Sequence, residues 1–166
     1  IEKYISNPFL VDGKKTSFRV YALQSGADPL RIYVHEFGFL GNSPFNYTLN
    51  EKSLKNILVH IVNRGVVDNY IEKYNSIYKD YLKKWKKMKS IISIDELKES
   101  VEKQGGNYRK IREKINDQVI KILIVNSNTH KLMVNRRGFN DANFFLFWGF
   151  DFLIDDKFEP HFIEIN

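Results

Sequence analysis

Two carboxylates near the end of the chain have a spacing that could hold a metal ion. Asp151 lies in the apolar run Phe150 to Ile154, and Glu164 lies in the run Phe162 to Asn166. The polar segment Asp155 to Lys157 separates the two runs, which predicts two strands joined by a hairpin. A turn near Lys157 and Phe158 would place Asp151 opposite Glu164, give or take a residue.

Alternation along the strands decides which side chains accompany this pair. Glu164 and Asn166 share a face with Asp151, and the apolar residues point the other way, into a core. These core residues are Phe150, Phe152, Ile154, Ile163 and Ile165. The pattern provides no Lys or Arg on the polar face, and directly opposed like charges are destabilising. Mg²⁺, which takes oxygen ligands, would neutralise the pair; an ordinary hairpin whose polar face meets water is the alternative.

Composition limits the class of protein. The 166 residues are 43% hydrophobic and 14% aromatic, which is typical of one folded domain. There is no cysteine, so disulfides, thiolate catalysis and Cys-based zinc sites are excluded, and the four histidines lack zinc-ligand spacing. No apolar run reaches the ~18 residues of a membrane span, and no signal peptide is recognisable. The chain begins without Met and stops inside the predicted site, so we expect a piece of a longer protein.

The net charge of +6 is concentrated in one segment. Six lysines crowd there: Lys79, Lys83, Lys84, Lys86, Lys87 and Lys89. Apolar residues recur between them at spacings of three and four, which predicts an amphipathic helix over residues 70–89. Its lysine face is either simply solvated or a patch for an acidic partner. No nucleic-acid-binding motif accompanies it.

The remaining pattern predicts the elements that position these residues. Strands are expected at 3–10, 16–24 and 30–35, a loop at 36–53, and a segment of ambiguous state at 54–67. Ser93 and Glu96 form a capping-box signature for a helix over 93–103, and a further helix is expected over 108–126. The aromatic run 144–148 is expected in the core. Strands, then helices, then a hairpin indicate an α+β fold.

Several motifs together resemble the tubulin–tyrosine ligase family, whose members are ATP-grasp enzymes that join an amino acid to a tubulin carboxylate. The resemblance covers nearly the whole chain, in the family's order. It is carried by Lys3-Tyr4-Ile5, Asp12-Gly13-Lys14-Lys15, Phe18-Arg19-Val20-Tyr21, His60-Ile61-Val62-Asn63, Gly149-Phe150-Asp151 and Glu164-Ile165-Asn166. It implies an ATP-grasp-like α+β fold with residues 1–166 as one incomplete domain. This would be the carboxy-terminal part of the nucleotide-binding core, with a basic helical segment at about 70–115.

The resemblance also implies roles for individual residues. Those expected to contact ATP are Lys3, Tyr4 and Ile5 at a hinge beside the adenine, Lys15 and Arg19 near the phosphates, and His60, Asn63 and Ile163. Arg19 is also expected to be catalytic, and the expected Mg²⁺ ligands are Asp151, Glu164 and Asn166. Lys3 and Lys15 could equally be surface lysines, and His60 a hydrogen-bonded structural residue. An arginine inside an apolar strand, such as Arg19, favours a functional role.

Some positions depart from the family pattern. Glu2 stands where glutamine is usual, Ser17 replaces an acidic residue, and Val62 replaces threonine. Leu146 replaces a glutamate. A second arginine expected in the loop after Tyr33 is missing, with Gly41 near its place.

The implied function is an ATP-dependent ligase that joins tyrosine, glutamate or glycine to tubulin or a similar acidic polypeptide through an acyl phosphate. Its partners would be a free amino acid and tubulin or microtubules, with acidic tails meeting the lysine-rich helix. No nucleic acid or membrane is expected, and the expected location is the cytoplasm and cytoskeleton, including a cilium or basal body. The alternative is a catalytically weak, microtubule-binding relative that retains the fold.

Overall fold

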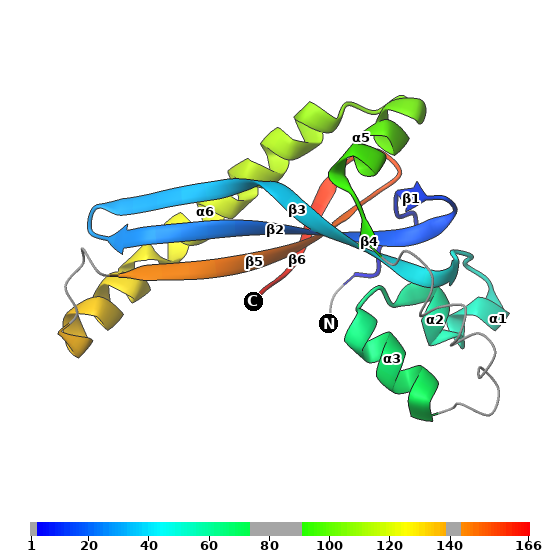
Figure 1. Ribbon diagram of the computed structural model, residues 1–166, viewed down its shortest axis with the longest axis horizontal. Helices are drawn as coiled ribbons and strands as arrows, with labels where there is room; N and C mark the ends of the chain where they lie inside the picture. The colour runs from blue at the N-terminus through cyan, green and yellow to red at the C-terminus, as the bar shows by residue number, and fades with distance from the viewer. Residues whose placement is uncertain (1–2, 74–90, 139–143) are drawn as a thin grey trace.

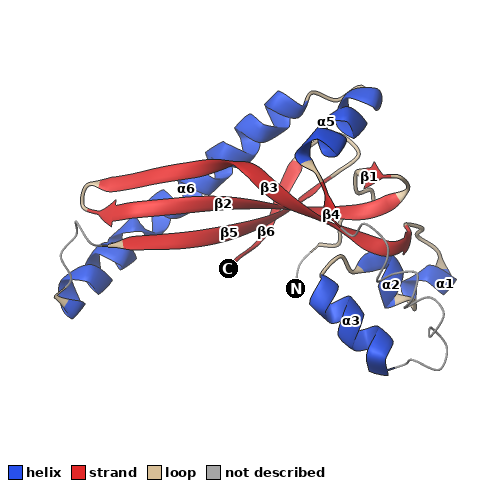
Figure 2. Ribbon diagram, in the orientation of Figure 1, coloured by secondary structure: helices blue, strands red, loops and turns tan. Residues whose placement is uncertain are grey.

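One antiparallel sheet organises the molecule. The computed structural model describes residues 3–73, 91–138 and 144–166, and within them the strand order is β4-β3-β2-β5-β6, with β1 pairing β2 at one end (Figures 1 and 2). The strands are β1 (Leu10–Val11), β2 (Lys14–Ala27), β3 (Leu30–Asn46), β4 (Ile91–Ile92), β5 (Phe145–Ile154) and β6 (Pro160–Ile165). The expected α+β arrangement is therefore confirmed.

Two helices cover one face of the sheet, and the core lies between these helices and the sheet. These are α5 (Ile94–Lys103) and α6 (Tyr108–Arg137), and Figure 1 shows α6 running along the sheet behind the strands. Phe18, Val20 and Ala22 of β2 alternate with residues of the other face and are fully or almost fully buried. Phe150 and Phe152 of β5 extend this layer, into which α5 and α6 insert apolar side chains.

Local signals fix where these helices begin and end. The predicted capping box is present: Ser93 Oγ accepts from the Glu96 N–H at 3.2 Å, and the Glu96 carboxylate accepts from the Ser93 N–H at 2.8 Å. Asn107 caps α6. This helix continues past the predicted end at residue 126 because no Gly or Pro follows until Gly138, which adopts φ +64° at the C-cap.

The long strand β3 corrects the prediction of a loop over residues 36–53. Gly38 and Pro44 lie within a strand that runs to Asn46 and pairs with β2 along its length. Gly38 permits this pairing because a Cβ there would lie 2.3 Å from the Arg19 carbonyl oxygen. The predicted strand over residues 3–10 is mostly wrong, since only Leu10–Val11 form a strand, with a bridge at Pro8.

Among the described residues, helices α1, α2 and α3 gather at one end of the sheet, where the sequence pattern is ambiguous (Figure 2). They are α1 (Glu51–Leu54), α2 (Ile57–His60) and α3 (Arg64–Lys73). Leu58, Val67 and Ile71 form a second small core there, against Phe45 of β3. Most of the predicted basic helix, including the six lysines from Lys79 to Lys89, lies outside the described residues, as does Glu2.

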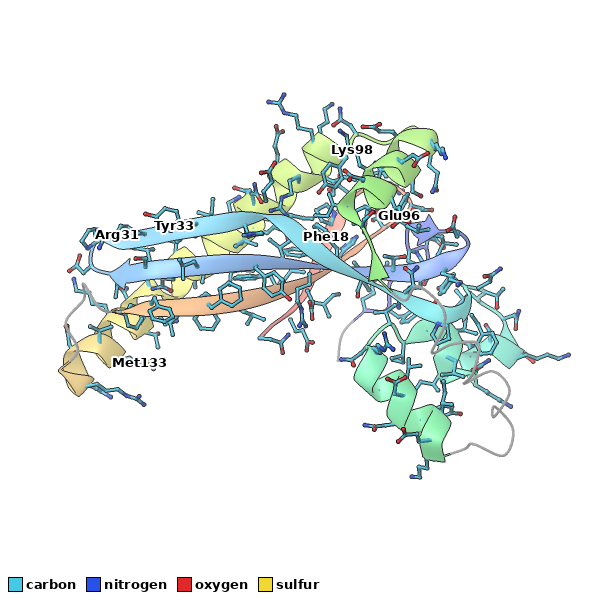
Figure 3. The ribbon with its side chains drawn as sticks, in the orientation of Figure 1. Phe18, Arg31, Tyr33, Glu96, Lys98 and Met133 are labelled. Carbon is cyan, nitrogen blue, oxygen red and sulfur yellow. The ribbon has the colours of Figure 1, made fainter. Side chains whose placement is uncertain are left out.

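The other face of the sheet is open over part of its length, so the prediction that the aromatic run 144–148 is core is wrong for Phe145 and Phe147, whereas Trp148 does pack against the core. Phe145 and Phe147 have exposed fractions of 69% and 63%, because alternate residues of β5 point away from the helices. Phe147 stacks on Tyr21 with ring centroids 5.2 Å apart. Figure 3 shows Arg31 and Tyr33 at this same end of the sheet, near the β2–β3 turn.

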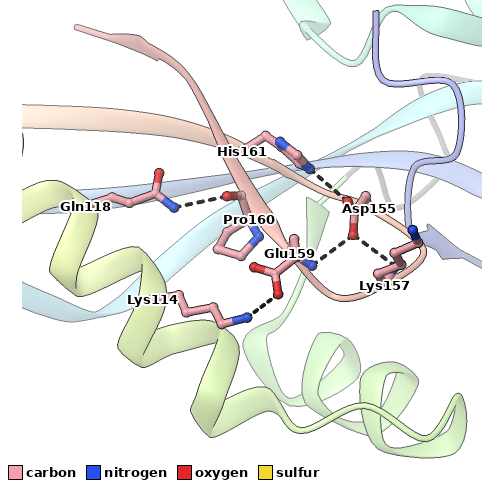
Figure 4. A network of polar contacts seen from close by, with 7 residues as sticks. All are labelled: Lys114, Gln118, Asp155, Lys157, Glu159, Pro160 and His161. Carbon is pink, nitrogen blue, oxygen red and sulfur yellow. Dashed lines mark hydrogen bonds and ion pairs between the residues drawn. The ribbon is translucent and has the colours of Figure 1, made fainter.

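The terminal hairpin has the predicted register, with Asp151 opposite Glu164. Phe158 adopts φ +62° in the turn. Asp155 closes that turn: its Oδ1 accepts from the N–H groups of Lys157 and Glu159, both at 2.9 Å, and its Oδ2 lies 2.9 Å from His161 Nε2 (Figure 4).

A register shift in β6 corrects the prediction that Ile163 and Ile165 enter the core. Phe162 pairs with Phe152, so Ile163 is an extra residue between two paired positions, as in a β-bulge. Both isoleucines have exposed fractions of 37%. No helix in residues 3–73, 91–138 and 144–166 is both long and apolar enough to cross a membrane.

Candidate functional site

A cavity of about 460 Å³ lies on the sheet face opposite α5 and α6. Strands β2, β3, β5 and β6 line it together with residues 60–65. Seven of the predicted site residues line it: Lys15, Arg19, His60, Asn63, Asp151, Ile163 and Glu164. Ile163 does so because the irregularity in β6 keeps it out of the core. Lys3, Tyr4, Ile5 and Asn166 are not among the lining residues.

Arg19 and Asp151 form a bidentate ion pair across β2 and β5. Arg19 Nε lies 2.7 Å from Asp151 Oδ1, and its NH2 lies 2.5 Å from Oδ2. The hydrogen bond to Asp151 raises the pKa of Arg19 above its ordinary value. The prediction that no Lys or Arg shares the face of the carboxylate pair is therefore wrong. The hairpin pattern does not contain this information, because Arg19 comes from the strand on the opposite side of β5.

Asp151 consequently lies in a row of three charged residues, with Arg19 on one side and Glu164 on the other. Asn166 joins this group: its Nδ2 lies 3.4 Å from Asp151 Oδ2 and 3.4 Å from Glu164 Oε1. Reciprocal backbone hydrogen bonds with Gly149, both 2.8 Å, hold Asn166 in place. The three predicted metal ligands therefore converge on one point.

The chemistry of this group can be compared with the needs of Mg²⁺. In the part of the chain that the structure describes, no three His, Cys, Asp or Glu side chains gather where they could hold a metal ion. Two carboxylates and an amide that can turn its oxygen inward nevertheless fit Mg²⁺, which commonly takes one or two carboxylates and completes its shell with water and phosphate oxygens. The predicted ligand set thus suits a metal that arrives with a phosphate group.

Lys15 is a buried cation at the other end of the cavity, with an exposed fraction of only 6%. Its Nζ lies 3.5 Å from the Tyr4 hydroxyl and 4.6 Å from the centroid of the Tyr4 ring. Burial lowers the pKa of Lys15, and no carboxylate among the described residues counteracts this. A buried ammonium group without a counterion is costly, so this environment favours an anionic ligand. The alternative prediction of a surface lysine is wrong.

His60 is hydrogen-bonded through both ring nitrogens. Its Nε2 lies 2.9 Å from the Ser53 carbonyl oxygen, which can only accept, so Nε2 carries the proton. Its Nδ1 then accepts from the Tyr4 hydroxyl at 2.8 Å. Tyr4 thus connects His60 to Lys15, and burial raises the pKa of Tyr4 well above its ordinary value. His60 has the hydrogen bonds of a structural residue while it lines the cavity.

Asn63 determines where α3 begins. Its Oδ1 accepts from the Val66 N–H at 3.2 Å, and its carbonyl accepts from the Val67 N–H at 3.0 Å. The positive end of the helix dipole therefore points toward the cavity, which Arg64 and Gly65 line.

Arg64 also lines the cavity, and it was not among the residues predicted from the sequence. It adds a positively charged residue to the lining. It begins α3, whose first turn carries no acidic residue. Cations near a helix N-terminus oppose its dipole by about 0.3–1 kcal/mol, so this position is locally unfavourable for arginine. The only sequence signal was its place directly after Asn63, in a segment of ambiguous state.

Gly41, near the place where the family resemblance predicts an arginine, is in close contact with this same segment. A Cβ at Gly41 would lie 3.1 Å from the Val62 carbonyl oxygen and 3.5 Å from Ser17 Oγ. The absence of a side chain therefore lets residues 60–65 approach β3.

Comparison with known proteins decides the family. The family model described as the tubulin-tyrosine ligase family matches residues 1–166. The chain belongs to the tubulin-tyrosine ligase family. The whole chain is 29% identical over 169 residues to a probable alpha-tubulin polyglutamylase of Tetrahymena thermophila, of which it covers 36%.

Two further known proteins are similar to this chain. It is 29% identical over 170 residues to a tubulin monoglutamylase of Mus musculus, with all of the chain and 14% of that protein covered. It is 31% identical over 169 residues to a tubulin polyglutamylase of Homo sapiens, with 98% of the chain and 18% of that protein covered. The chain thus spans little more than a third, or less, of the length of these relatives.

Proposed function

We propose that this chain forms the phosphate- and metal-binding part of an ATP-dependent ligase that joins an amino acid to a carboxylate of tubulin or a similar acidic polypeptide. The observation that carries the proposal is the pairing of opposite charges in one cavity. The buried Lys15 has no carboxylate partner in the described part of the chain, and Asp151 and Glu164, paired on the neighbouring strands β5 and β6, line the same cavity. A metal–phosphate complex such as Mg²⁺–ATP would satisfy both groups.

Each residue has a distinct part in the proposed reaction. Lys15 binds a phosphate oxygen as a point charge, and Arg19 offers a planar guanidinium to the transferring phosphoryl group. Asp151, Glu164 and Asn166 would hold Mg²⁺, which supplies Lewis-acid screening of the phosphate charge. The acceptor carboxylate attacks the γ-phosphate and yields an acyl phosphate with release of ADP. The amine of the incoming amino acid then displaces phosphate.

The proposal extends to the fold and to the amino acid. Residues 1–166 would be one incomplete ATP-grasp domain in which Lys3, Tyr4 and Ile5 meet the adenine, and His60, Asn63 and Ile163 also contact the nucleotide. Membership of the tubulin-tyrosine ligase family supports this reading. The names of three relatives refer to glutamylation of tubulin, so glutamate is the proposed amino acid, ahead of tyrosine and glycine.

The lysine-rich segment is the proposed docking surface for the acidic tail of the polypeptide, which would place the protein on the cytoskeleton. Exchange of Lys83, Lys84, Lys86 and Lys87 for Gln in the complete protein should raise KM for the polypeptide and leave ATP affinity unchanged. Because the attraction between exposed charges is screened by salt, the effect should shrink as ionic strength rises. An unchanged KM at low salt would eliminate this surface as the docking site.

A second candidate is a catalytically weak relative that binds microtubules. The absence of the second arginine predicted in the loop after Tyr33, near Gly41, favours this candidate. Incubation of the complete protein with ATP, Mg²⁺, tubulin and labelled glutamate, tyrosine or glycine separates the two candidates. Incorporation that is lost in Glu164→Gln and retained in the control Glu102→Gln, an exposed carboxylate on α5, supports the ligase. Co-sedimentation with microtubules without incorporation supports the second candidate.

A further inference from the structure

The hydroxyl group of Tyr4 has no part in the proposed reaction, yet it joins two residues of the cavity. Tyr4 comes from the segment before β1, Lys15 from β2 and His60 from α2. Lys15 and His60 both line the cavity, whereas Tyr4 does not. The Tyr4 hydroxyl lies 2.8 Å from His60 Nδ1 and 3.5 Å from Lys15 Nζ. Three segments that are distant in the sequence therefore meet at one hydroxyl group.

Ser53 fixes the direction of these hydrogen bonds. Its carbonyl oxygen lies 2.9 Å from His60 Nε2 and can only accept, so Nε2 carries the proton of the neutral imidazole and Nδ1 accepts from Tyr4. A hydroxyl group has one proton to donate and two lone pairs that accept. Tyr47, another neighbour of the Tyr4 hydroxyl, gives its own proton to the Ser6 carbonyl at 2.7 Å. Tyr4 has therefore committed its proton to His60, and its oxygen remains as an acceptor.

That oxygen restrains the ammonium group of Lys15, whose backbone is already fixed. The Lys15 N–H donates to Ser43 Oγ at 3.1 Å, and Lys15 pairs with Leu10 of β1. At the other end of the side chain, Nζ contacts the Tyr4 hydroxyl and lies 4.6 Å from the centroid of the Tyr4 ring. An ammonium group within about 6 Å of an aromatic centroid is attracted by the ring. Since a free lysine side chain samples many rotamers, these two contacts restrict where its charge can lie.

Apolar packing does not explain a tyrosine at position 4. Tyr4 is 44% exposed and belongs to neither of the two apolar cores of the described residues. Its ring meets the His60 ring edge-on, with centroids 5.9 Å apart and planes at 77°. The side chain thus contacts two polar residues of the site and contributes little to the core.

We propose that Tyr4 is a positioning residue: its hydroxyl group, oriented by His60, holds the Lys15 ammonium where it meets a phosphate oxygen of the nucleotide. The inference rests on the proposed function, in which Lys15 binds that oxygen. An ammonium group has three N–H donors, so one can stay on Tyr4 while the others bind the phosphate. The phenol of Tyr4 thus acts on the nucleotide through Lys15.

A double-mutant cycle on the complete protein tests this role, with ATP affinity as the measurement. Tyr4→Phe keeps the ring and removes the acceptor oxygen, so it should weaken ATP binding roughly 2- to 10-fold, the usual effect of one lost hydrogen bond. In the Lys15→Met background the same substitution should leave ATP affinity unchanged, because no ammonium group remains to be positioned. The matched control Tyr33→Phe removes an exposed phenolic hydroxyl at the far end of the sheet and should bind ATP as wild type does (Figure 3).

A second measurement needs no nucleotide: the rate at which an acylating reagent modifies Lys15, followed by mass spectrometry of the complete protein. Tyr4→Phe should speed this modification severalfold, because the amine loses a partner that holds it. The exposed Lys157, in the β5–β6 turn, is the internal reference and should react at the same rate in both proteins.

Two outcomes of the cycle would overturn the proposal. One is an equal loss of ATP affinity from Tyr4→Phe in both backgrounds, which would mean that Tyr4 contacts the nucleotide independently of Lys15. The other is wild-type ATP affinity in Tyr4→Phe beside a weakened Lys15→Met. If Lys15→Met itself binds ATP as wild type does, the proposed function loses its phosphate-binding residue. The acylation rate then decides the contact by itself: acceleration relative to Lys157 supports a restraint of Lys15 by Tyr4, and an unchanged rate refutes it.

Discussion

The guanidinium of Arg19 faces the carboxylate of Asp151 across two neighbouring strands, with Nε and NH2 each within 2.7 Å of a different oxygen. The next strand places Glu164 on the other side of Asp151. Asp151 therefore has a counterion within the protein and a like charge beside it. A bound metal would add a second positive partner to this row rather than supply the first.

Arg19→Ala should destabilise the protein and increase the stabilisation that Mg²⁺ gives it. The variant leaves Asp151, whose side chain is only 18% exposed, opposite Glu164 without a counterion, at a cost of about 1–3 kcal/mol. Thermal unfolding of the complete protein with and without Mg²⁺ measures both effects. Mg²⁺ should raise Tm more in Arg19→Ala than in wild type. The control is Arg31→Ala, at the far end of the same sheet (Figure 3); an Arg19→Ala protein with wild-type Tm in the absence of Mg²⁺ would contradict the expectation.

Lys15→Met should stabilise the protein while weakening nucleotide binding. Burial lowers the folded-state pKa of Lys15, so its charge opposes folding at every pH below that value. Removal of the charge should stabilise the fold by on the order of 1 kcal/mol at neutral pH. As pH rises toward the unfolded-state value near 10.4, wild-type Lys15 deprotonates in the folded protein and the difference in Tm should shrink. Thermal unfolding across pH and ATP titration measure the two effects; a less stable variant with unchanged ATP affinity would show that Lys15 is structural.

Asp155→Ala should loosen the turn that joins β5, which carries Asp151, to β6, which carries Glu164. Burial alone would raise the pKa of Asp155, but hydrogen bonds from His161 and from the Glu159 and Lys157 N–H groups outweigh it and lower that pKa. The loss should cost about 1–3 kcal/mol.

The pH dependence of this turn has a defined sign. Because the folded-state pKa of Asp155 is lowered, its stabilisation is complete above the unfolded-state value near 3.9 and disappears as pH falls through the folded-state value. Hydrogen exchange of β5 and β6 should therefore accelerate in Asp155→Ala at pH 7 and resemble wild type in strong acid. Asp156→Ala, the exposed neighbour, is the control. Equal exchange of the two variants at pH 7 would refute the role of Asp155.

Gly106→Ala should destabilise the contact between the α5–α6 connection and the hairpin. A Cβ at Gly106 would lie 2.6–2.8 Å from three ring atoms of Phe158, which is held at φ +62° and packs against Phe9. The ring must move, at a cost of about 1–3 kcal/mol. A double-mutant cycle with Phe158→Ala tests the cause, because the penalty of Gly106→Ala should vanish once the ring is absent. A penalty that persists in that background would place the strain elsewhere.

Local features of this protein can be predicted from the sequence because neighbouring residues create them. The Ser93–Glu96 capping box joins residues three positions apart. The pairing of Asp151 with Glu164 depends on the turn and on the extra residue Ile163, because the register at the turn pairs Phe152 with Phe162. The burial of Phe150 and Phe152 follows from alternation with a period of two. The α+β class and the alternation along the strands are therefore properties of the sequence by itself, whereas the convergence of Asp151, Glu164 and Asn166 also needs the extra residue Ile163.

Only the tertiary structure decides which strand borders the hairpin and which face of the sheet the helices cover. Arg19 meets Asp151 across a separation of 132 residues, and no local periodicity encodes that pairing. The irregular pairing that turns Ile163 toward the cavity and the exposed fractions of Phe145 and Phe147 depend on how β6 and the helices pack on the sheet. Arg64 lines the cavity because Gly41 lets a distant backbone segment approach β3. Short-range rules determine the elements of this protein, whereas long-range packing determines which charges meet in its site.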